Sequence, residues 1–310
     1  MAGKQNSTAK GTKKASPKQT HSQKAETRHN KNTAADTHAG VQEEKKDTVS
    51  SHEHSQASQS EQYTAETKNT VLEAELIMNE HSEEVRSMFK KITRHYDLLN
   101  HVCSLGLDFW WRKVLVDGFA LGSTNKILDM AAGTLDVSLS ALKKYKHISV
   151  VAGDICPEML EMGKEKLKAN DAERIELATI DALAIPYPEN SFDVVCMAFG
   201  IRNIEEKIKA LREMKKVLVI GGQVHILEFS PVKNPFLQKV YYFYIEKIMP
   251  VIARLFGENP EAYAYLAKSI KDFPGQDEFC VEMRKAGFDL VNYKKLSFGI
   301  VTVYTAIKSK

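Results

Sequence analysis

The hydrophobic residues of the chain follow one rhythm before about residue 122 and a different one after it. Between Glu66 and Leu121 they recur every three or four residues, which is the spacing of one face of an α-helix. From Lys126 onward, short apolar runs alternate with stretches that suit amphipathic helices. We therefore predict an N-terminal helical cap over residues 66–122 and a domain of alternating strands and helices over residues 123–310.

The apolar runs after residue 122 predict the strands of a parallel sheet. The expected strands cover residues 126–132, 149–153, 175–180, 192–197 and 223–229, and the expected helices between them cover residues 136–146, 157–169 and 204–218. Pro157 stands in the first turn of one of these helices, where proline is favoured. Alternation at this spacing implies right-handed βαβ units and an open parallel sheet with helices on both faces.

The alternation is interrupted over residues 231–274, where aromatic residues are frequent, and we predict a helical insertion there. A helix over residues 277–286 and two strand-like runs over 288–296 and 300–307 follow. The short connection between these two runs predicts an antiparallel hairpin. A mostly parallel, Rossmann-like α/β sheet of seven strands that ends in such a hairpin is typical of class I methyltransferases.

The first 62 residues lack the side chains needed for a hydrophobic core. Between Ala2 and Gln62 the only large aliphatic residues are Val41 and Val49, and Leu, Ile, Phe, Tyr, Trp and Cys are absent. Residues 1–65 are therefore expected to be a disordered, low-complexity tail, because they bury too little apolar surface to offset chain entropy. The tail carries 10 basic and 7 acidic residues, which leaves 33 of each in the rest of the chain. That neutrality argues against a nucleic-acid binder.

Cysteine spacing and hydropathy exclude further classes of protein. Cys103, Cys156, Cys196 and Cys280 are at least 40 residues apart and form no CxxC pair, so the sequence predicts neither a disulfide framework nor a metal site. No uncharged apolar run reaches the roughly 18 residues of a membrane span, and the N-terminus has no apolar signal segment. We expect a cytoplasmic protein that is soluble, or that contacts the inner face of a membrane only peripherally.

The loop after the first expected strand is where an open α/β sheet binds its ligand. A dinucleotide site needs G-x-G-x-x-G there, whereas this chain has Ala131, Gly133 and Asp136. The acid at 136 and the bulky residue before it suit a diphosphate poorly and suit the positively charged S-adenosylmethionine better. Asp154, at the end of the second strand, can accept hydrogen bonds from both ribose hydroxyls, or it can cap the next helix instead.

Six segments together resemble the ubiquinone/menaquinone C-methyltransferases of the UbiE type. They are residues 129–136, 153–155, 181–188, 190–193, 199–203 and 227–230. Upstream, Met88-Phe-x-x-Ile92, Tyr96-Asp-x-x-Asn100, Ser104-x-Gly106 and Trp111 are similar to the N-terminal signature of the same family. The resemblance covers about residues 83–308. Phe-Gly-Ile-Arg-Asn at 199–203 and the Tyr-Asp-x-x-Asn block are its most specific parts.

The resemblance implies that the cofactor is S-adenosylmethionine. The cofactor-binding residues it implies are Asp129, Gly133, Thr134, Asp154, Asp181, Ala182 and Ala198. Asp181 can accept a hydrogen bond from the adenine amino group, and the backbone N–H of Ala182 can donate to a ring nitrogen. The family usually has Gly where Leu135 stands and commonly Ser where Ala198 stands. We expect Leu135 to point into the packing of the following helix while Gly133 keeps the turn.

The resemblance also implies methyl transfer to a ring carbon of a prenylated quinol, demethylmenaquinol first and the benzoquinol of the ubiquinone pathway second. The catalytic candidates are Arg202, Asn203, Tyr96 and Asp97. Arg202 is permanently charged and can stabilise a phenolate, or it can merely pair with Glu205 or Glu206. Asn203 can bind a quinol oxygen. Tyr96 and Asp97 can reach the substrate from a helical lid, or they can serve as a structural cap.

A prenyl tail needs an apolar channel, for which the insertion supplies candidates. The expected lining residues, which are simple core in the alternative interpretation, are Phe236, Tyr241, Phe243, Tyr244, Ile248, Met249, Val251, Leu255 and Phe256. Two other functions stay open: a methyltransferase for another small hydrophobic acceptor, and a non-catalytic subunit that binds S-adenosylmethionine or quinol. A nicotinamide oxidoreductase is the least favoured class. Peripheral membrane contact and a homodimer also stay open.

Overall fold

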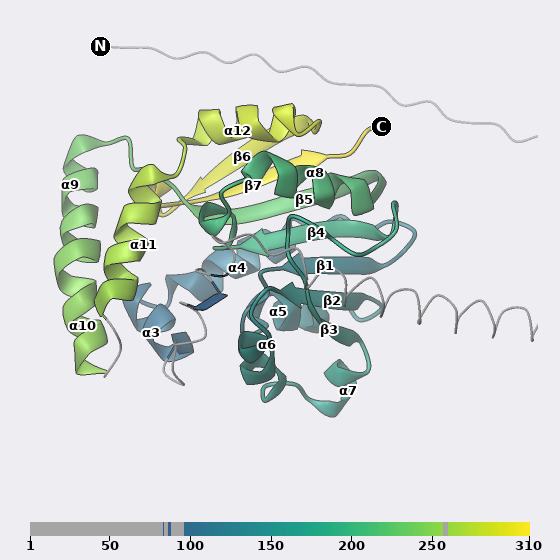
Figure 1. Cartoon of the computed structure of the whole chain (residues 1–310), viewed down its shortest axis with the longest axis horizontal. Coiled ribbons are helices and arrows are strands. Elements are labelled where there is room, and N and C mark those ends of the chain that lie inside the picture. Colours follow the sequence, from purple (N-terminus) through teal and green to yellow (C-terminus); the bar gives the residue numbers. More distant parts are fainter. Residues whose placement is uncertain (1–82, 84–85, 88–95, 257–259) are drawn as a thin grey trace, which may run out of the picture. The chain divides into compact units, whose positions relative to one another are not determined.

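Seven strands form a single mixed sheet in the computed structural model, which describes residues 83, 86–87, 96–256 and 260–310. The strands are β1 (Lys126–Met130), β2 (Ser149–Asp154), β3 (Ile175–Thr179), β4 (Phe192–Ala198), β5 (Leu218–Phe229), β6 (Asp289–Leu296) and β7 (Val301–Ile307). Their order across the sheet is β3-β2-β1-β4-β5-β7-β6 (Figure 1). The expected tail over residues 1–65 and most of the helical cap expected before residue 96 lie outside the described residues.

The strand directions confirm the predicted α/β class. Strands β1 to β5 are parallel to one another, and β7 runs antiparallel to both β5 and β6. The hairpin turns through the short 3₁₀ helix η3 (Ser297–Gly299), which is the predicted connection. The carboxyl ends of the five parallel strands therefore share one edge of the sheet, and their loops meet there.

Helices cover both faces of the sheet because its central strands are apolar on both sides. The helices outside the insertion are α3 (Tyr96–Cys103), α4 (Leu107–Asp117), α5 (Asp136–Lys144), α6 (Pro157–Lys164), α7 (Ala169–Ala172), α8 (Lys207–Val217) and α12 (Gln276–Lys285). In β4, Val194 and Cys196 pack in the cluster that holds α4 and α5, while Val195 and Met197 pack with α8 and α12. Both interiors are hydrophobic, as a parallel sheet requires.

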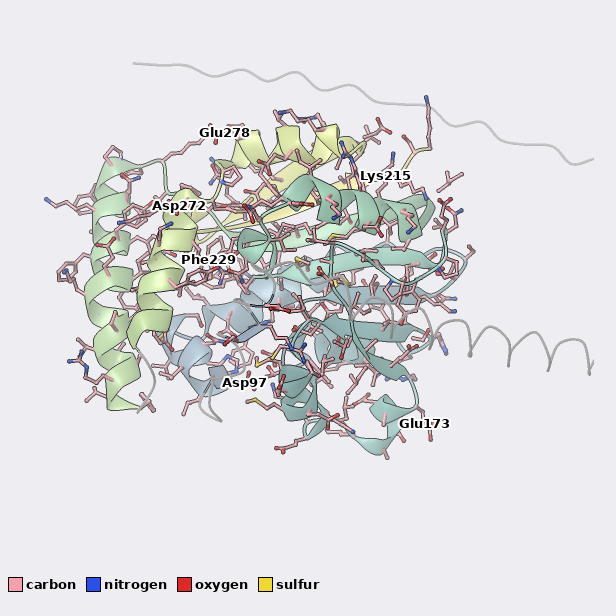
Figure 2. The ribbon with its side chains drawn as sticks, viewed as in Figure 1. Asp97, Glu173, Lys215, Phe229, Asp272 and Glu278 are labelled. Atoms are coloured by element: carbon pink, nitrogen blue, oxygen red, sulfur yellow. The ribbon has the colours of Figure 1, made fainter. Side chains whose placement is uncertain are left out.

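The segment after β5 folds into helices that stand at one end of the sheet (Figure 1). They are α9 (Pro235–Phe243), the π-helical turn η2 (Tyr244–Ile248), α10 (Met249–Leu255) and α11 (Pro260–Asp272). Asn234 begins α9, and its side-chain oxygen accepts a hydrogen bond from the Leu237 N–H at 3.0 Å. Phe229, at the end of β5, packs into the core of these helices (Figure 2).

Two elements differ from their predictions by five residues, and smaller differences occur elsewhere, as in α8, which was predicted over 204–218 and covers Lys207–Val217. The helix expected over residues 157–169 is two helices, α6 and the short α7, with the chain turning between them. Strand β5 begins five residues earlier than expected, at Leu218. Its pairing with β4 is interrupted after that residue and resumes at Gln223, and Gly221 in between has a φ of 83°. The irregular stretch breaks the apolar pattern, which is why the sequence hides the true start of the strand.

Candidate functional site

One cavity of about 520 Å³ lies where the carboxyl ends of the parallel strands meet the insertion helices. The residues expected at the site that line it are Asp97, Asp129, Gly133, Thr134, Asp154, Asp181, Ala182, Ala198, Arg202 and Asn203. Tyr96 begins α3, but its side chain lies outside the described part of the chain. The fold thus brings residues from the ends of four strands and from helix α3 to one cavity of the size that small-molecule sites have.

The loop after β1 is fixed by hydrogen bonds to the end of β2. The Gly133 N–H donates to Asp154 Oδ2 at 2.8 Å, and the Ala132 N–H donates to the Gly153 carbonyl at 3.1 Å. Gly133 has a φ of 53°, a left-handed conformation that glycine adopts without steric cost. The other oxygen of Asp154 accepts from the Cys156 N–H at 2.8 Å. Asp154 therefore orders the loop that faces the cavity and the turn before α6, but it is not the cap of that helix, because the N-cap residue is Cys156 and no side chain caps α6.

Leu135 occupies a position where glycine would be expected, and the structure shows how it is accommodated. Its φ is 70°, and its side chain is completely buried against Ala152 and Leu160. Gly163 on α6 makes the room, because a Cβ there would lie 2.5 Å from Leu135 Cγ. Leu135 thus points away from the cavity into the packing between α5 and α6, and it does not appear among the residues that line the cavity.

Two buried carboxylates stand at the sheet side of the cavity. Asp129 accepts a hydrogen bond from Ser138 Oγ at 2.6 Å and is 1% exposed, and Asp154 is 8% exposed. Burial raises the pKa of Asp129 to about 6 and that of Asp154 to about 6, against the opposing effect of the hydrogen bonds that each accepts. A nearby cation would lower both pKa values again, so these two groups favour a positively charged ligand.

The loop after β3 supplies Asp181 and Ala182. Asp181 Oδ1 accepts a hydrogen bond from the Leu183 N–H at 2.8 Å, which turns the backbone at the cavity wall. Ala182 is buried, and Ala198 ends β4 beside Leu227 of β5. Both alanines leave space that a larger side chain would fill.

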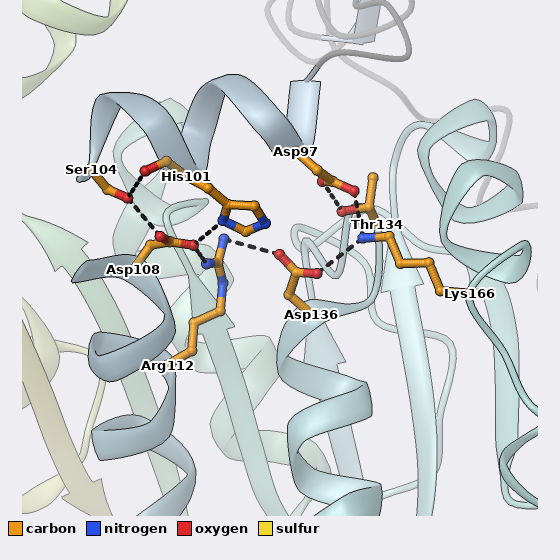
Figure 3. Close-up of polar contacts among 8 residues, drawn as sticks. All are labelled: Asp97, His101, Ser104, Asp108, Arg112, Thr134, Asp136 and Lys166. Carbon is orange, nitrogen blue, oxygen red and sulfur yellow. Dashed lines mark hydrogen bonds and ion pairs between the residues drawn. The ribbon is translucent and has the colours of Figure 1, made fainter. Parts of the chain in front are cut away.

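Charged side chains join the lid helix α3 to the loop after β1 (Figure 3). Thr134 Oγ1 donates to Asp97 Oδ1 at 2.6 Å, and Lys166 Nζ lies 2.5 Å from Asp97 Oδ2 and 3.0 Å from Asp136 Oδ1. Arg112 lies 3.3 Å from Asp136 and extends this network into α4. Asp97 therefore contacts both Thr134 and Lys166, and the contact with Thr134 connects α3 to the loop after β1.

The same network continues to the far end of α3. Asp108 is 3% exposed and pairs with Arg112, while His101 Nδ1 lies 2.6 Å from its Oδ2. Ser104 Oγ donates to the other oxygen at 2.6 Å. Lid helix α3 is thus attached at both ends by groups around Asp97 and Asp108. The partners of Asp108 are within seven residues of it along the chain, whereas Asp97 is paired with Thr134 and Lys166, which are far from it in sequence and gave no sign of the contact.

Arg202 pairs with a buried glutamate that the sequence interpretation did not consider. Its Nη1 lies 2.8 Å from Glu228 Oε1, and the same atom donates to the Phe199 carbonyl. Glu228 is fully buried; burial raises its pKa above the ordinary value, and the charge of Arg202 opposes that rise. The expected alternative, a pair with Glu205 or Glu206, is wrong. Strands β4 and β5 are parallel neighbours, so the loop after β4 meets the last residues of β5.

Asn203 is connected to the insertion. Tyr265 on α11 donates from its hydroxyl to Asn203 Oδ1 at 3.2 Å, and Asn203 is 7% exposed.

Of the partners that the sequence analysis missed, Glu228 lies in one of the segments that resemble the family, so the sequence did contain a signal for it. Tyr265 had no such signal, because its contact depends on how α11 folds back.

The aromatic residues of the insertion divide between two faces. Tyr241, Tyr244 and Met249 line the cavity, together with Leu237 and Ile245. The expectation that every apolar side chain of this segment lines a channel is wrong. The residues of that expectation that are instead exposed are Phe236 (80%), Phe243 (60%), Ile248 (39%), Val251 (55%), Leu255 (80%) and Phe256 (37%). A helix on the surface of a domain can turn only one side inward.

The charge of the cavity fits S-adenosylmethionine, which has a sulfonium and an ammonium group. The acidic residues that line the cavity are Asp97, Asp108, Asp129, Asp136, Asp154, Asp181 and Glu205, against two basic residues, Arg112 and Arg202. Both arginines are already paired with carboxylates. A diphosphate would be repelled by this wall, whereas a cation would be stabilised by it. The residues present therefore fit the cofactor that the sequence pattern indicates.

No group of three or more His, Cys, Asp or Glu side chains in residues 96–256 and 260–310 is arranged to hold a metal ion. Within the same part of the chain, every helix is too short or too polar to cross a bilayer.

Comparison with known proteins gives a match over most of the chain. The model of the ubiE/COQ5 methyltransferase family matches residues 77–308. The chain is 40% identical over 233 residues to the ubiquinone/menaquinone biosynthesis C-methyltransferase UbiE of Geobacter sp. (strain M21), with 74% of this chain and 99% of that protein covered. It is 40% identical over 235 residues to the protein of the same name from Rickettsia bellii (strain OSU 85-389), covering 74% and 94%.

Solved structures share the fold at low sequence identity. A SAM-dependent methyltransferase from Thermotoga maritima, described as a possible histamine N-methyltransferase, is 17% identical with a TM-score of 0.51, covering 72% of this chain and 98% of that one. A putative methyltransferase solved with the Trm112 methyltransferase activator of Haloferax volcanii is 13% identical, with a TM-score of 0.50 and coverage of 67% and 94%. These likenesses confirm the class I methyltransferase fold.

Proposed function

Because the chain belongs to the ubiE/COQ5 methyltransferase family, we propose that it transfers a methyl group from S-adenosylmethionine to a ring carbon of a prenylated quinol. The observation that carries this proposal is the two-sided lining of the cavity. One side is acidic and built from strand ends, the other is apolar and built from the insertion, and Arg202 and Asn203 stand in its wall. Demethylmenaquinol is the first candidate substrate and the benzoquinol of the ubiquinone pathway the second.

The sheet side of the cavity holds the cofactor. Asp154 accepts hydrogen bonds from the ribose, Asp181 and the Ala182 N–H recognise the adenine, and Asp129, Gly133 and Thr134 surround the methionine part. Bound S-adenosylmethionine supplies an electrophilic methyl group on a positively charged sulfur. Asp97 serves as a positioning residue here, because it joins the lid helix to Thr134.

Arg202 and Asn203 act on the acceptor ring. The quinol O–H would pass its proton to water, and the ring carbon adjacent to that oxygen would then accept the methyl group while the carbon–sulfur electron pair stays on sulfur. The proton on the methylated ring carbon would pass to water and the oxygen would be protonated again, which restores the aromatic quinol and releases one proton overall. Arg202 carries no acceptor site, so it cannot take either proton; it stabilises the phenolate electrostatically while Glu228 holds its guanidinium in place. Asn203 binds a ring oxygen. Tyr96 stays a predicted contributor.

The exposed apolar face of the insertion supports a peripheral contact with the membrane in which a prenylated quinol dissolves. Its residues on α9, η2 and α10 are Phe236, Phe243, Ile248, Val251 and Leu255, which lie along one continuous helical segment. The inner face of the same helices lines the cavity. The prenyl chain of a quinol that leaves the bilayer would therefore pass directly between these helices and the sheet.

The test of the reaction is transfer of radiolabel from S-adenosylmethionine to extracted quinone. Reduced demethylmenaquinone in detergent micelles is assayed beside a benzoquinol that lacks the ring methyl group. Label in the naphthoquinone alone assigns the menaquinone pathway, and label in both assigns a dual role. Arg202→Ala should lose turnover while it still binds S-adenosylhomocysteine. No label in either ring, with cofactor binding intact, would refute the proposed acceptor.

The membrane contact is tested separately by co-sedimentation of the full chain with vesicles of mixed neutral and anionic lipid. Phe243→Ser combined with Val251→Ser should release the protein from the pellet without lowering turnover on micellar substrate. Ile220→Ser is the matched control, because Ile220 is 71% exposed but lies on β5, outside the insertion. Equal sedimentation of all variants would refute the contact.

A further inference from the structure

Two buried polar atoms in the cavity wall have no hydrogen-bonding partner among the described residues. They are the hydroxyl oxygen of Tyr241 and Nε of Arg202. Tyr241 is 8% exposed, and the side chain of Arg202 is 9% exposed. Both residues line the same cavity, one from α9 and the other from η1 (Ile201–Asn203). Buried polar groups in proteins are almost always paired, so two orphans in one wall need an explanation.

Packing explains the ring of Tyr241 but not its hydroxyl. Tyr241, Ile245 and Met249 are spaced four residues apart and form the inner face of the insertion, where they pack on Ala267 and Ile270 of α11. Phenylalanine would fill the same space. A buried hydroxyl without a partner costs free energy relative to that simpler ring. Hydrophobic packing therefore does not account for the hydroxyl oxygen of Tyr241, which needs a hydrogen-bonding partner.

Two other tyrosines of the insertion, unlike Tyr241, have hydrogen-bonded hydroxyl groups. The Tyr244 hydroxyl donates to the Cys103 carbonyl at 3.0 Å, and the Tyr265 hydroxyl donates to Asn203 at 3.2 Å. Both are satisfied within the protein and attach the insertion to its surroundings. The hydroxyl of Tyr241 is left for a group from outside the chain.

The electrostatic surroundings keep Tyr241 protonated. Burial raises the pKa of its hydroxyl well above the ordinary value, while the nearby Arg202 charge opposes that rise and the carboxylate of Glu228 reinforces it. At neutral pH the group is thus a hydrogen-bond donor. Nε of Arg202 also carries a hydrogen and can only donate. A single oxygen has two lone pairs, so one oxygen of a bound molecule could accept from both donors, whose residues line the same cavity.

We propose that Tyr241 and Arg202 Nε donate hydrogen bonds to one oxygen of the acceptor ring, the oxygen next to the carbon that receives the methyl group. This inference rests on the proposed function and deepens it. The oxygen becomes negatively charged when the quinol loses its proton, so donors aimed at it stabilise the reacting state more than the neutral ring. The same pair of donors would select a phenolic acceptor over an amine, because a phenol oxygen has two lone pairs whereas a neutral amine nitrogen has one and an ammonium has none.

The test uses Tyr241→Phe in the full chain, with Tyr242→Phe as the matched control. Tyr242 is the adjacent residue, and it does not line the cavity. Tyr241→Phe should lower kcat about 10- to 100-fold, the usual effect of losing one donor to a developing charge. The Kd for S-adenosylhomocysteine should stay unchanged. The melting temperature should stay equal or rise, because an unpaired buried hydroxyl has been removed. Tyr242→Phe should match the wild type in all three.

A second measurement does not depend on methyl transfer. 1-Naphthol bound to the protein is titrated by its absorbance, which shifts when the hydroxyl ionises. The wild type should lower the pKa of bound 1-naphthol relative to the free compound, and Tyr241→Phe should raise it again by about one unit for each tenfold loss of stabilisation. A merely structural tyrosine would leave this pKa unchanged.

The outcomes separate the two proposals. Equal kcat values and equal naphthol pKa values for Tyr241→Phe and Tyr242→Phe would overturn the oxygen site while leaving the quinol methyltransferase intact. A melting temperature several degrees lower with unchanged kcat would also overturn it, since the hydroxyl would then be bonded within the protein. A wild type that methylates no quinol but still shows the Tyr241-dependent naphthol shift would refute the proposed function and retain the oxygen site.

Discussion

Leu135 offers the sharpest test of how the cofactor loop is held. It has a φ of 70°, where a non-glycine residue costs about 1 kcal/mol, and its side chain is fully buried. Replacement by glycine removes that strain but also removes a core leucine, and truncating a buried leucine costs about 2–5 kcal/mol. The net expectation for Leu135→Gly is a loss of about 1–4 kcal/mol. In a domain of this size that corresponds to a fall in melting temperature of roughly 2 to 15 °C.

The matched control is another leucine with positive φ. Leu290 has a φ of 46° but is 68% exposed, so Leu290→Gly relieves strain and gives up little burial. Its melting temperature should stay equal to that of the wild type or rise. Differential scanning calorimetry on both variants compares the same substitution in two environments, with burial as the main difference.

Gly163 extends the test to a double-mutant cycle. A Cβ at this position would lie 2.5 Å from Leu135 Cγ and 2.8 Å from the carbonyl carbon of Thr134, so Gly163→Ala should destabilise by about 1–3 kcal/mol. In the Leu135→Gly background the first clash disappears and the second remains. The double variant should therefore be more stable than the sum of the single effects, by a coupling energy between about 0.5 and 3 kcal/mol. Additive losses, or a rise in melting temperature for Leu135→Gly, would refute the reasoning.

Three further predictions concern charged groups of the cavity. Burial raises the pKa of Asp154 to about 6, so between about pH 4 and pH 6 the folded protein without cofactor keeps this proton while the unfolded chain loses it. The contribution of Asp154 to stability is therefore fully present below about pH 4 and is lost as pH rises through about 6. Binding of S-adenosylmethionine should accordingly strengthen between pH 5 and 7 in calorimetric titrations, and Asp154→Asn should reduce that dependence to the part that Asp129 contributes. Glu228→Gln leaves the Arg202 charge uncompensated and should lower the free energy of unfolding by about 3 kcal/mol in urea denaturation; an unchanged midpoint would show that the pair is dispensable. Asp97→Asn keeps an acceptor for Thr134 but loses the ion pair with Lys166, so the KM for S-adenosylmethionine should rise severalfold at nearly constant melting temperature, whereas a large thermal loss would show a structural role instead.

The sequence by itself determined the parts of this protein that depend on neighbours along the chain. Apolar runs such as 192–197 become buried strands in any parallel sheet, so the order of strands and helices, the final hairpin and the loop around Gly133 were all predicted. The sequence also predicted that Asp154 and Arg202 lie at the ligand site, because the loops that follow parallel strands meet at one edge of the sheet.

Only the tertiary structure decided which side chains meet across elements. Glu228 was in view as part of a motif, yet its pairing with Arg202 depends on β4 and β5 lying side by side. The buried position of Leu135 depends on a glycine 28 residues later, and the unpaired hydroxyl of Tyr241 depends on how α9 packs against α11. Periodicity says how often a helix turns a side chain inward, but contacts between distant segments decide which side is inward and what it touches.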